Sequence, residues 1–171
     1  MQVVKKAFMV LFVAWFAFVL FMPKRNLYYK VEQELATQGI KINEGSIREG
    51  LFSLDIDKAV IYIQGIDLIH VTHASFFSLL FYSSMTLQEI VVDDSLKNMV
   101  PTSLDEATLS HVIWNPAHVE VSGKGAFGTF KGDIDLFQHK VHLDFTGLSE
   151  HSILKRQLKK DEKGWYYETS F

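Results

Sequence analysis

A run of sixteen residues near the N-terminus constrains this chain more than any other feature. Residues 7–22 carry no charged side chain, and their one polar side-chain group is the indole N–H of Trp15. A soluble domain would have to bury such a run, and the 149 residues that follow it contain no matching segment of that length. The run therefore predicts a membrane segment, with the rest of the chain working beside a bilayer.

The length of the run is close to what a bilayer needs. Sixteen residues at about 1.5 Å each give roughly 24 Å, against a hydrocarbon core of about 30 Å. Basic residues flank both ends of the run, and long basic side chains can reach back to the interface. We expect four of them to contact lipid headgroups: Lys5, Lys6, Lys24 and Arg25.

A cleaved signal peptide is the alternative interpretation of the run. Its basic start fits that interpretation, but residues 18–25 hold no small residues where a signal peptidase would need them. We therefore expect an uncleaved, single-pass anchor. Basic residues on both sides leave the orientation nearly balanced. The acidic character of the following domain favours a cytoplasmic N-terminus and a C-terminal domain outside the cytoplasm.

Charge is distributed unevenly along the chain. Residues 1–30 hold five Lys or Arg and no acid, so residues 31–171 hold the other 12 basic residues against all 20 acidic ones, a net charge of −8. An acidic domain does not suit nucleic acid, which needs basic surfaces. The basic N-terminal segment suits lipid headgroups instead. The absence of cysteine excludes disulfides and thiolate chemistry.

Hydrophobic periodicity predicts a mainly β fold after the anchor. Apolar residues at helical spacing predict a short juxtamembrane helix over 27–38, ended by Gly39. From Ile40 the period changes to two, which predicts short strands in an antiparallel, curved sheet. The predicted strands are 40–42, 54–57, 59–63, 66–73, 85–92, 111–114, 118–122, 125–131, 133–137, 141–145 and 165–171.

Three segments do not alternate in this way. Residues 75–83 are apolar but short, and predict a buried turn of helix or a loop that fills a gap. Residues 94–110 predict a loop or short helix, in which Ser103 and Glu106 have the spacing of a capping box. Residues 151–160 predict a basic amphipathic helix. The predicted organisation is an anchor over 1–25, the juxtamembrane helix over 26–39 and a β-rich domain over 40–171.

No set of residues has the spacing of a known catalytic or metal site. Gly123, Gly125 and Gly128 match G-x-G-x-x-G, but strands are predicted on both sides, so we interpret them as bends in a curved sheet. Seven histidines lack metal-ligand spacing, and the carboxylate pairs 55/57 and 133/135 fit solvated strand faces. We expect no cofactor, no metal and no enzyme activity.

Over residues 7–95 the order of these parts resembles the N-terminal region of AsmA-like proteins and of the type II secretion protein N family. The resemblance rests on apolar residues and glycines in the anchor and in segments 39–42, 44–47, 50–56, 65–68, 76–80 and 85–92. Residues 123–136 resemble the glycine-marked β-repeats of the same group. The resemblance implies a bacterial inner-membrane anchor and a groove-forming periplasmic sheet. It also implies a role in envelope lipid homeostasis, lipid transport or secretion assembly.

Two functions remain open at this point. The first is a structural or interaction component of an envelope or secretion assembly, with other envelope proteins as partners. The second is a lipid-binding or lipid-transfer module whose apolar sheet face holds membrane lipid. Alternation nominates the residues that would line such a groove: Ile40, Ile42, Leu54, Ile56, Val141, Leu143 and Phe145. A structural role is favoured if helices cover these residues. Lipid binding is favoured if these residues line an open trough.

Overall fold

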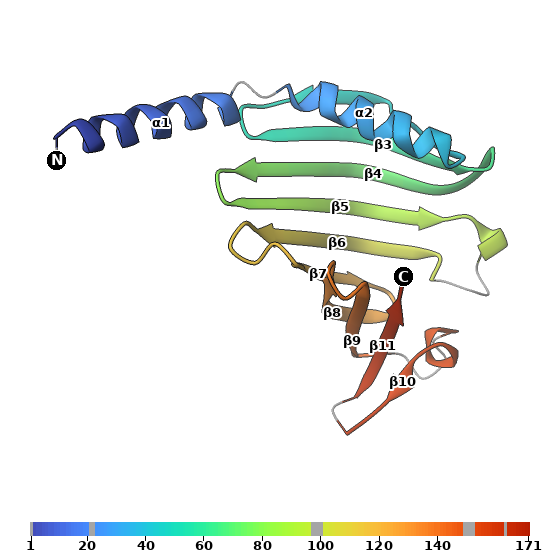
Figure 1. The fold of residues 1–171 in the computed structure, drawn as a ribbon. Coiled ribbons are helices and arrows are strands. Elements are labelled where there is room, and N and C mark those ends of the chain that lie inside the picture. Colours follow the sequence, from blue (N-terminus) through green and yellow to red (C-terminus); the bar gives the residue numbers. More distant parts are fainter. Residues whose placement is uncertain (1, 21–22, 97–100, 149–152, 163) are drawn as a thin grey trace.

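The structure, a computed structural model, describes residues 2–20, 23–96, 101–148, 153–162 and 164–171. Within these ranges the chain is mainly β, with two α-helices and one antiparallel sheet of eleven strands (Figure 1). The prediction of a mainly β chain with an antiparallel sheet and short helices is confirmed.

Both α-helices lie at the N-terminal end. α1 (Gln2–Leu20) projects beyond the sheet, and α2 (Lys24–Thr37) lies across the first strands (Figure 1). Gly39 follows α2 with a φ of +81°, and its N–H donates to the carbonyl of Ala36 at 3.1 Å, so the predicted helix over 27–38 is confirmed. Among the residues that the structure describes, neither helix combines the length and the apolar character that crossing a bilayer requires.

The strands follow one another as a meander over most of the sheet. Their bounds are β1 (Ile40–Asn43), β2 (Ser46–Glu49), β3 (Ser53–Ile63), β4 (Ile66–Leu79), β5 (Tyr82–Val92), β6 (Ser103–Val112), β7 (His118–Gly125), β8 (Gly128–Asp135), β9 (Lys140–Thr146), β10 (Lys159–Lys160) and β11 (Trp165–Ser170). Two 3-10 turns, η1 (Asp94–Leu96) and η2 (Ile153–Arg156), lie between strands. The order across the sheet is β1-β3-β4-β5-β6-β7-β8-β9-β11-β10, with β2 also paired to β3. Strands β3 to β9 therefore form the meander, and the remaining strands pair at its two sides.

The strand register separates apolar from polar side chains. One apolar row crosses eight strands through Leu54, Phe76, Met85, Leu109, Val121, Gly132, Leu143 and Tyr167. A second apolar row runs through Ile56, Ala74, Leu87, Ala107, Gly123, Phe130, Phe145 and Trp165. Between them lies a more polar row through Asp55, Ser75, Thr86, Thr108, Ser122, Lys131, Asp144 and Tyr166. Because successive side chains point to opposite faces, the sheet has one apolar face and one polar face.

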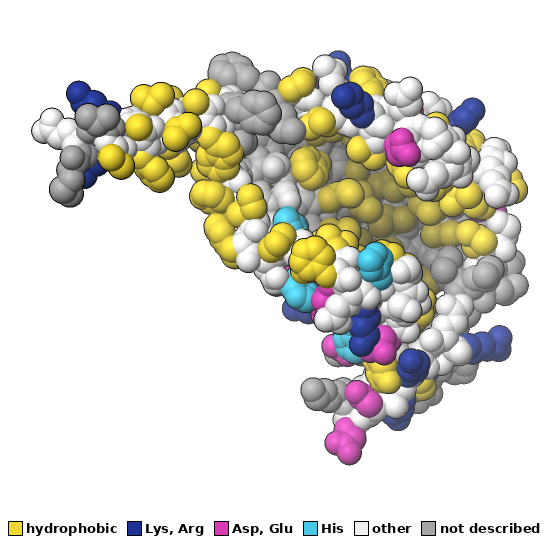
Figure 2. Space-filling view, in the orientation of Figure 1, with side chains coloured by type: hydrophobic (Ala, Val, Ile, Leu, Met, Phe, Trp, Pro, Cys, Tyr) yellow, Lys and Arg dark blue, Asp and Glu magenta, His cyan; other side chains and the backbone are white. Residues whose placement is uncertain are grey.

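The sheet curls around its apolar face. In Figure 2 hydrophobic side chains line a hollow between α2 and the C-terminal strands. Within the described residues, no second sheet lies against this hollow. The fold is therefore one curved layer with a helix along its first strands, instead of the two packed layers that most domains use to enclose a core.

Four consecutive strands interrupt the alternation at corresponding positions. Each of β3 to β6 carries two adjacent polar residues between apolar ones: Asp57-Lys58, Thr72-His73, Gln88-Glu89 and Asp105-Glu106. Lys58 and Glu89 have positive φ angles of 56° and 52°. One residue of each doublet has no partner in the register, and pairing resumes beyond it in the same register: Lys58, Thr72, Glu89 and Asp105. Each of these strands therefore carries one extra residue at the same level of the sheet, which lets its apolar side chains return to the same face. We call these positions the bulge row.

Three sequence-based expectations were wrong. Residues 75–83 form the end of β4 and the hairpin into β5, where Phe76 pairs with Met85. Of the predicted loop or short helix over 94–110, residues 94–96 do form the short helix η1, and residues 97–100 lie outside the described residues. Ser103, however, begins β6 and caps no helix, because β6 pairs with β5. Residues 153–160 form η2 and β10, since Lys159 and Lys160 pair with β11, and the rest of the predicted helix, residues 151–152, lies outside the described residues.

The bulge row generates a testable prediction. A non-glycine residue in the left-handed region costs roughly 1–2 kcal/mol, and glycine in a strand costs about 0.5–1 kcal/mol. Glu89→Gly should therefore raise the free energy of unfolding by about 0.5 kcal/mol, and Glu89→Val should lower it by more than 1 kcal/mol, on the order of the left-handed penalty. Urea unfolding of the detergent-solubilised chain measures both.

Gln88→Gly is the matched control, because Gln88 is the neighbouring residue and has no positive φ. It should lower the free energy of unfolding by about 0.5–1 kcal/mol. Equal destabilisation by the two glycine variants would contradict the left-handed backbone at Glu89.

Candidate functional site: an apolar trough

The predicted groove residues lie on three strands that the fold brings to one face. Leu54 and Leu143 belong to the first apolar row, and Ile56 and Phe145 belong to the second. The others extend the same pattern: Val141 pairs with Ile134, Ile40 with Ile63, and Ile42 with Ile61. These seven residues come from β1, β3 and β9, so they lie toward the two sides of the sheet, with β4 to β8 between them.

The middle of the face is formed by residues that the sequence analysis did not nominate. Phe76, Met85, Leu87, Leu109 and Val121 connect the β3 residues to the β9 residues in unbroken rows. Their strands were predicted in part, but the polar doublets obscured the alternation. The doublets were the available signal, since an apolar–polar–polar–apolar pattern that recurs in successive strands indicates that the alternation is interrupted at one level of the sheet.

α2 covers the side of the face next to β1 and β2. The guanidinium of Arg25 donates to the carbonyl of Ile47 at 2.8 Å, and the backbone N–H of Lys24 donates to the carboxylate of Glu49 at 3.0 Å. Leu54 is 4% exposed here. Lys24 is also buried. Two of the four predicted headgroup residues, Lys24 and Arg25, therefore join α2 to the sheet. The other two, Lys5 and Lys6, are exposed on α1. Headgroup contact by any of the four stays a prediction.

The face becomes more open away from α2. Phe76 is 39% exposed and Met85 is 36% exposed, although both point to the apolar face. Among the described residues no large side chain is fully buried. The apolar face is therefore a trough, closed along one side by α2 and open over its centre (Figure 2).

An aromatic cluster fills the trough at β7 to β9. Phe127, from the β7–β8 turn, lies 6.3 Å from Phe130 and 6.4 Å from Phe145 between ring centroids, and it is itself buried. Gly123 leaves room for this cluster, because a Cβ at that position would lie 2.5 Å from the Phe130 ring. The glycine motif thus lies in the β7–β8 hairpin, with strands on both sides of it as predicted, and no helix begins within it.

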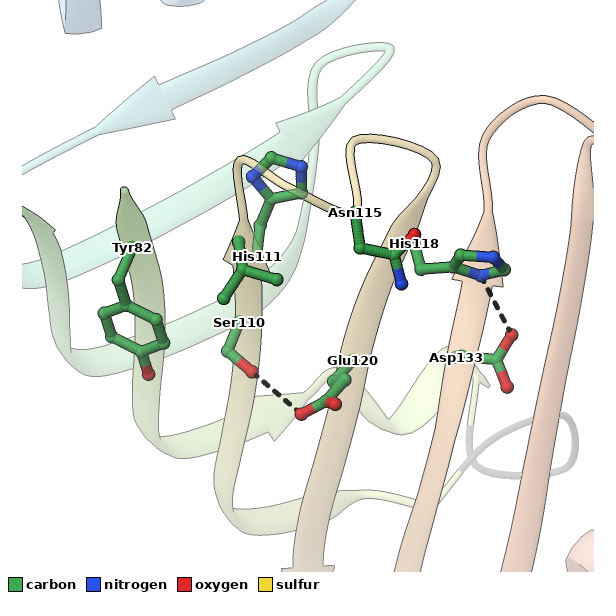
Figure 3. A pocket seen from close by; sticks show the side chains of 8 residues that line it. Tyr82, Ser110, His111, Asn115, His118, Glu120 and Asp133 are labelled. Atoms are coloured by element: carbon green, nitrogen blue, oxygen red, sulfur yellow. Dashed lines mark hydrogen bonds and ion pairs between the residues drawn. The ribbon is translucent and has the colours of Figure 1, made fainter. Parts of the chain in front are cut away.

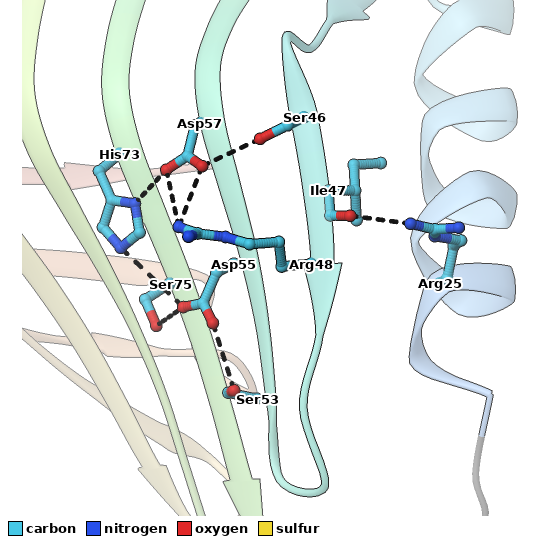
Figure 4. Close-up of polar contacts among 9 residues, drawn as sticks. All are labelled: Arg25, Ser46, Ile47, Arg48, Ser53, Asp55, Asp57, His73 and Ser75. Atoms are coloured by element: carbon cyan, nitrogen blue, oxygen red, sulfur yellow. Dashed lines mark hydrogen bonds and ion pairs between the residues drawn. The ribbon is translucent and has the colours of Figure 1, made fainter.

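A polar network on the opposite face joins β2, β3 and β4 (Figure 4). Asp57 accepts from Ser46 at 2.9 Å, contacts Nδ1 of His73 at 2.7 Å and pairs with Arg48 at 3.0 Å. Beside it, Ser75 donates to Asp55 at 2.7 Å. The hydrogen bond to His73 is the main cause that lowers the pKa of Asp57, followed by the hydrogen bond from Ser46. The network connects strands and does not lie in a cleft.

A pocket of about 330 Å³ lies on the β5–β8 strands, near the β6–β7 turn (Figure 3). Ser110 donates to Glu120 at 3.5 Å, and His118 stands 3.9 Å from both Asp133 and Asp135. These separations exceed the roughly 2.6–3.2 Å typical of a nucleophile hydrogen-bonded to its base. Across the described residues, no group of three or more His, Asp or Glu is placed to hold a metal ion. The apolar trough is the stronger candidate site.

Comparisons with protein-family models, curated proteins and solved structures find no match to this chain. The resemblance to AsmA-like proteins therefore stays an expectation from the sequence, and the function has to be argued from the geometry of the trough.

The polar network predicts a pH-dependent stability. Since the folded pKa of Asp57 lies below its ordinary value of 3.8, the carboxylate stabilises the fold above that pH, and the contribution is lost as the pH falls through the folded pKa. Asp57→Asn should lower the melting temperature at pH 6, and the difference from the wild type should shrink at pH 3. Circular dichroism melts measure this. A difference that stays constant with pH would exclude the carboxylate charge as the cause.

Proposed function

We propose that this chain is a membrane-attached, non-enzymatic lipid-binding protein whose trough holds acyl chains. The observation that carries the proposal is the continuous apolar face from β1 to β11, which α2 covers over its first strands. Apolar side chains lining the uncovered part, such as Phe76 and Met85, remain accessible. An exposed apolar surface that extends across several strands normally marks a binding site.

Contact between this face and an acyl chain is more favourable than contact between this face and water. Each methylene group removed from water contributes about 0.8 kcal/mol, so one lipid chain along the trough would contribute several kcal/mol. The trough offers a concave apolar surface with no charged residue in its two central rows. The resemblance to groove-forming envelope proteins supports the same substrate class.

α1 supports membrane attachment. Consecutive apolar side chains around the helix are exposed, including Met9, Val10 and Leu11, so no single face of it could be satisfied by packing on the sheet. A helix that is apolar all round is typical of a lipid environment. We propose that α1 is the lipid-embedded part of the predicted anchor, with the sheet outside the cytoplasm at a bacterial inner membrane.

A structural role in an envelope or secretion assembly is the second candidate. β10 pairs with two residues of β11, Trp165 and Tyr166. Within the described residues, the outer edge of β11 from Tyr167 to Ser170 therefore has no strand beside it. Such an edge can receive a strand from another protein. A co-purifying protein in place of lipid would favour this candidate.

The lipid proposal is tested with residues that line the trough without being deeply buried. Phe76→Ser combined with Met85→Ser should reduce co-purifying phospholipid by more than half, because two apolar contacts in the open centre are lost. Native mass spectrometry of the detergent-extracted protein measures bound lipid, and circular dichroism reports the fold.

Val91→Ser is the matched control. Val91 is exposed and pairs with His70 and Ser103, so it lies off the two apolar rows. Its lipid content should equal that of the wild type. A folded double variant with unchanged lipid content would contradict the trough as the lipid site.

The anchor has its own prediction. Ala14→Arg should weaken insertion by about 2.5–3.5 kcal/mol on translocon scales, whereas Ala14→Leu should leave it intact. Carbonate extraction of membranes measures the fraction that remains inserted. Equal retention of both variants would show that α1 does not reside in the hydrocarbon core.

A further inference from the structure

The hairpin turns at one edge of the sheet carry exposed apolar residues. The β2–β3, β4–β5, β6–β7 and β8–β9 turns all lie at this edge, since the strands are antiparallel neighbours. Trp114 is 71% exposed and Phe137 is 75% exposed. We call the exposed apolar residues of these turns the hairpin rim: Leu51, Phe81, Ile113, Trp114, Leu136 and Phe137.

The opposite edge differs in character. Its described turns present Gln64 and Gly65 between β3 and β4, Asp93 and Asp94 after β5, and Glu162 between β10 and β11. The aromatic residue there, Phe127, folds back onto the apolar face and is buried. Among the described residues at this edge, Ile66 in β4 and Val91 near the end of β5 are exposed large hydrophobic residues. Within the part of the chain that the structure describes, exposed apolar residues in turns therefore concentrate at the edge from which α1 projects.

α1 contacts the rim directly. The ring centroids of Trp15 and Phe81 are 5.4 Å apart, and those of Phe81 and Trp114 are 5.3 Å apart. Figure 1 shows α1 continuing past the β4–β5 and β6–β7 turns, away from the sheet. The helix and the rim therefore form one continuous apolar surface.

This contact fixes the depth of the rim relative to α1. Trp15 lies five residues before the end of α1 at Leu20, which corresponds to about 7.5 Å along the helix. If the apolar helix is in lipid up to its end, the residues beside Trp15 must lie below the membrane surface by a similar amount. Interfacial segments bury their apolar side chains by about 5–10 Å, in the zone where tryptophan is enriched.

We propose that the hairpin rim inserts into the headgroup–acyl boundary of the bilayer that holds α1. The occupant of this surface is lipid, because a protein covering the rim would have to occupy the depth at which α1 is already embedded. The inference rests on the proposed membrane attachment through α1. The rim gives the protein a second membrane contact beside α1. With both contacts in place the strands stand upright on the membrane. The end of the trough at the rim then faces the lipid, and the end at Phe127 points away from it.

Spin labelling tests this directly, because the chain contains no cysteine. Single cysteines replace three exposed residues: Phe137→Cys on the rim, Ile66→Cys at the opposite edge and Val10→Cys on α1. The full-length protein is labelled and reconstituted in vesicles of phosphatidylethanolamine and phosphatidylglycerol. Electron paramagnetic resonance then compares the access of oxygen, which partitions into lipid, with that of a water-soluble nickel chelate.

The expected result is preferential oxygen access at positions 137 and 10 and preferential nickel access at position 66. Nickel access at 137 with oxygen access at 10 would overturn the rim proposal and leave the anchor intact. Nickel access at 10 would overturn the anchor and, with it, this inference. Exclusion of both reagents at 137 would show a protein partner or a second copy on the rim, and would also overturn the proposal.

Discussion

The strand register is the constraint on which the rest of this structure depends. The register aligns apolar residues with one another in rows that run from Leu54 on β3 through Leu143 on β9 to β11, so these strands share one apolar face. Shifting any strand by one residue would move its apolar set to the polar face. The same register aligns the carboxylates, serines and histidines that connect strands on the other face, such as Asp57 with His73.

Because the sheet is a single layer, its apolar face is only partly covered. α2 and the aromatic cluster each cover a part of this face. α2 covers β1 to β3 through the contacts of Lys24 and Arg25 with β2. The aromatic cluster around Phe127 covers β7 to β9. The bulge row lies on β3 to β6, and the open centre of the apolar face is concave (Figure 2). A flat apolar sheet would favour aggregation, whereas a concave one can enclose a chain-like ligand.

Sequence reasoning predicted the class of the fold and the alternating strands, because period-two patterns such as Val141, Leu143 and Phe145 follow directly from pleat geometry. It failed where the alternation was broken by tertiary structure. The segment around Phe76 and Phe77 has apolar residues on both faces, and it becomes a strand because β5 pairs with it. Ser103 and Glu106 match a capping box by spacing, but β5 and β7 take their backbone into the sheet, and Glu106 pairs with Lys124 at 2.9 Å. The polar doublets could have revealed the bulge row if compared between strands. The contact of Trp15 with Phe81 has no local signal in the sequence.

The central claim is that acyl chains lie along the trough itself, away from the membrane surface. Nuclear Overhauser effects between protonated lipid and the methyl groups of an otherwise deuterated protein in nanodiscs would test it directly. The account predicts contacts from acyl methylenes to Leu87, Leu109 and Leu143, which lie in the central apolar rows. Acyl contacts confined to α1 and to rim residues such as Leu51 and Ile113, with none to those three leucines, would contradict it.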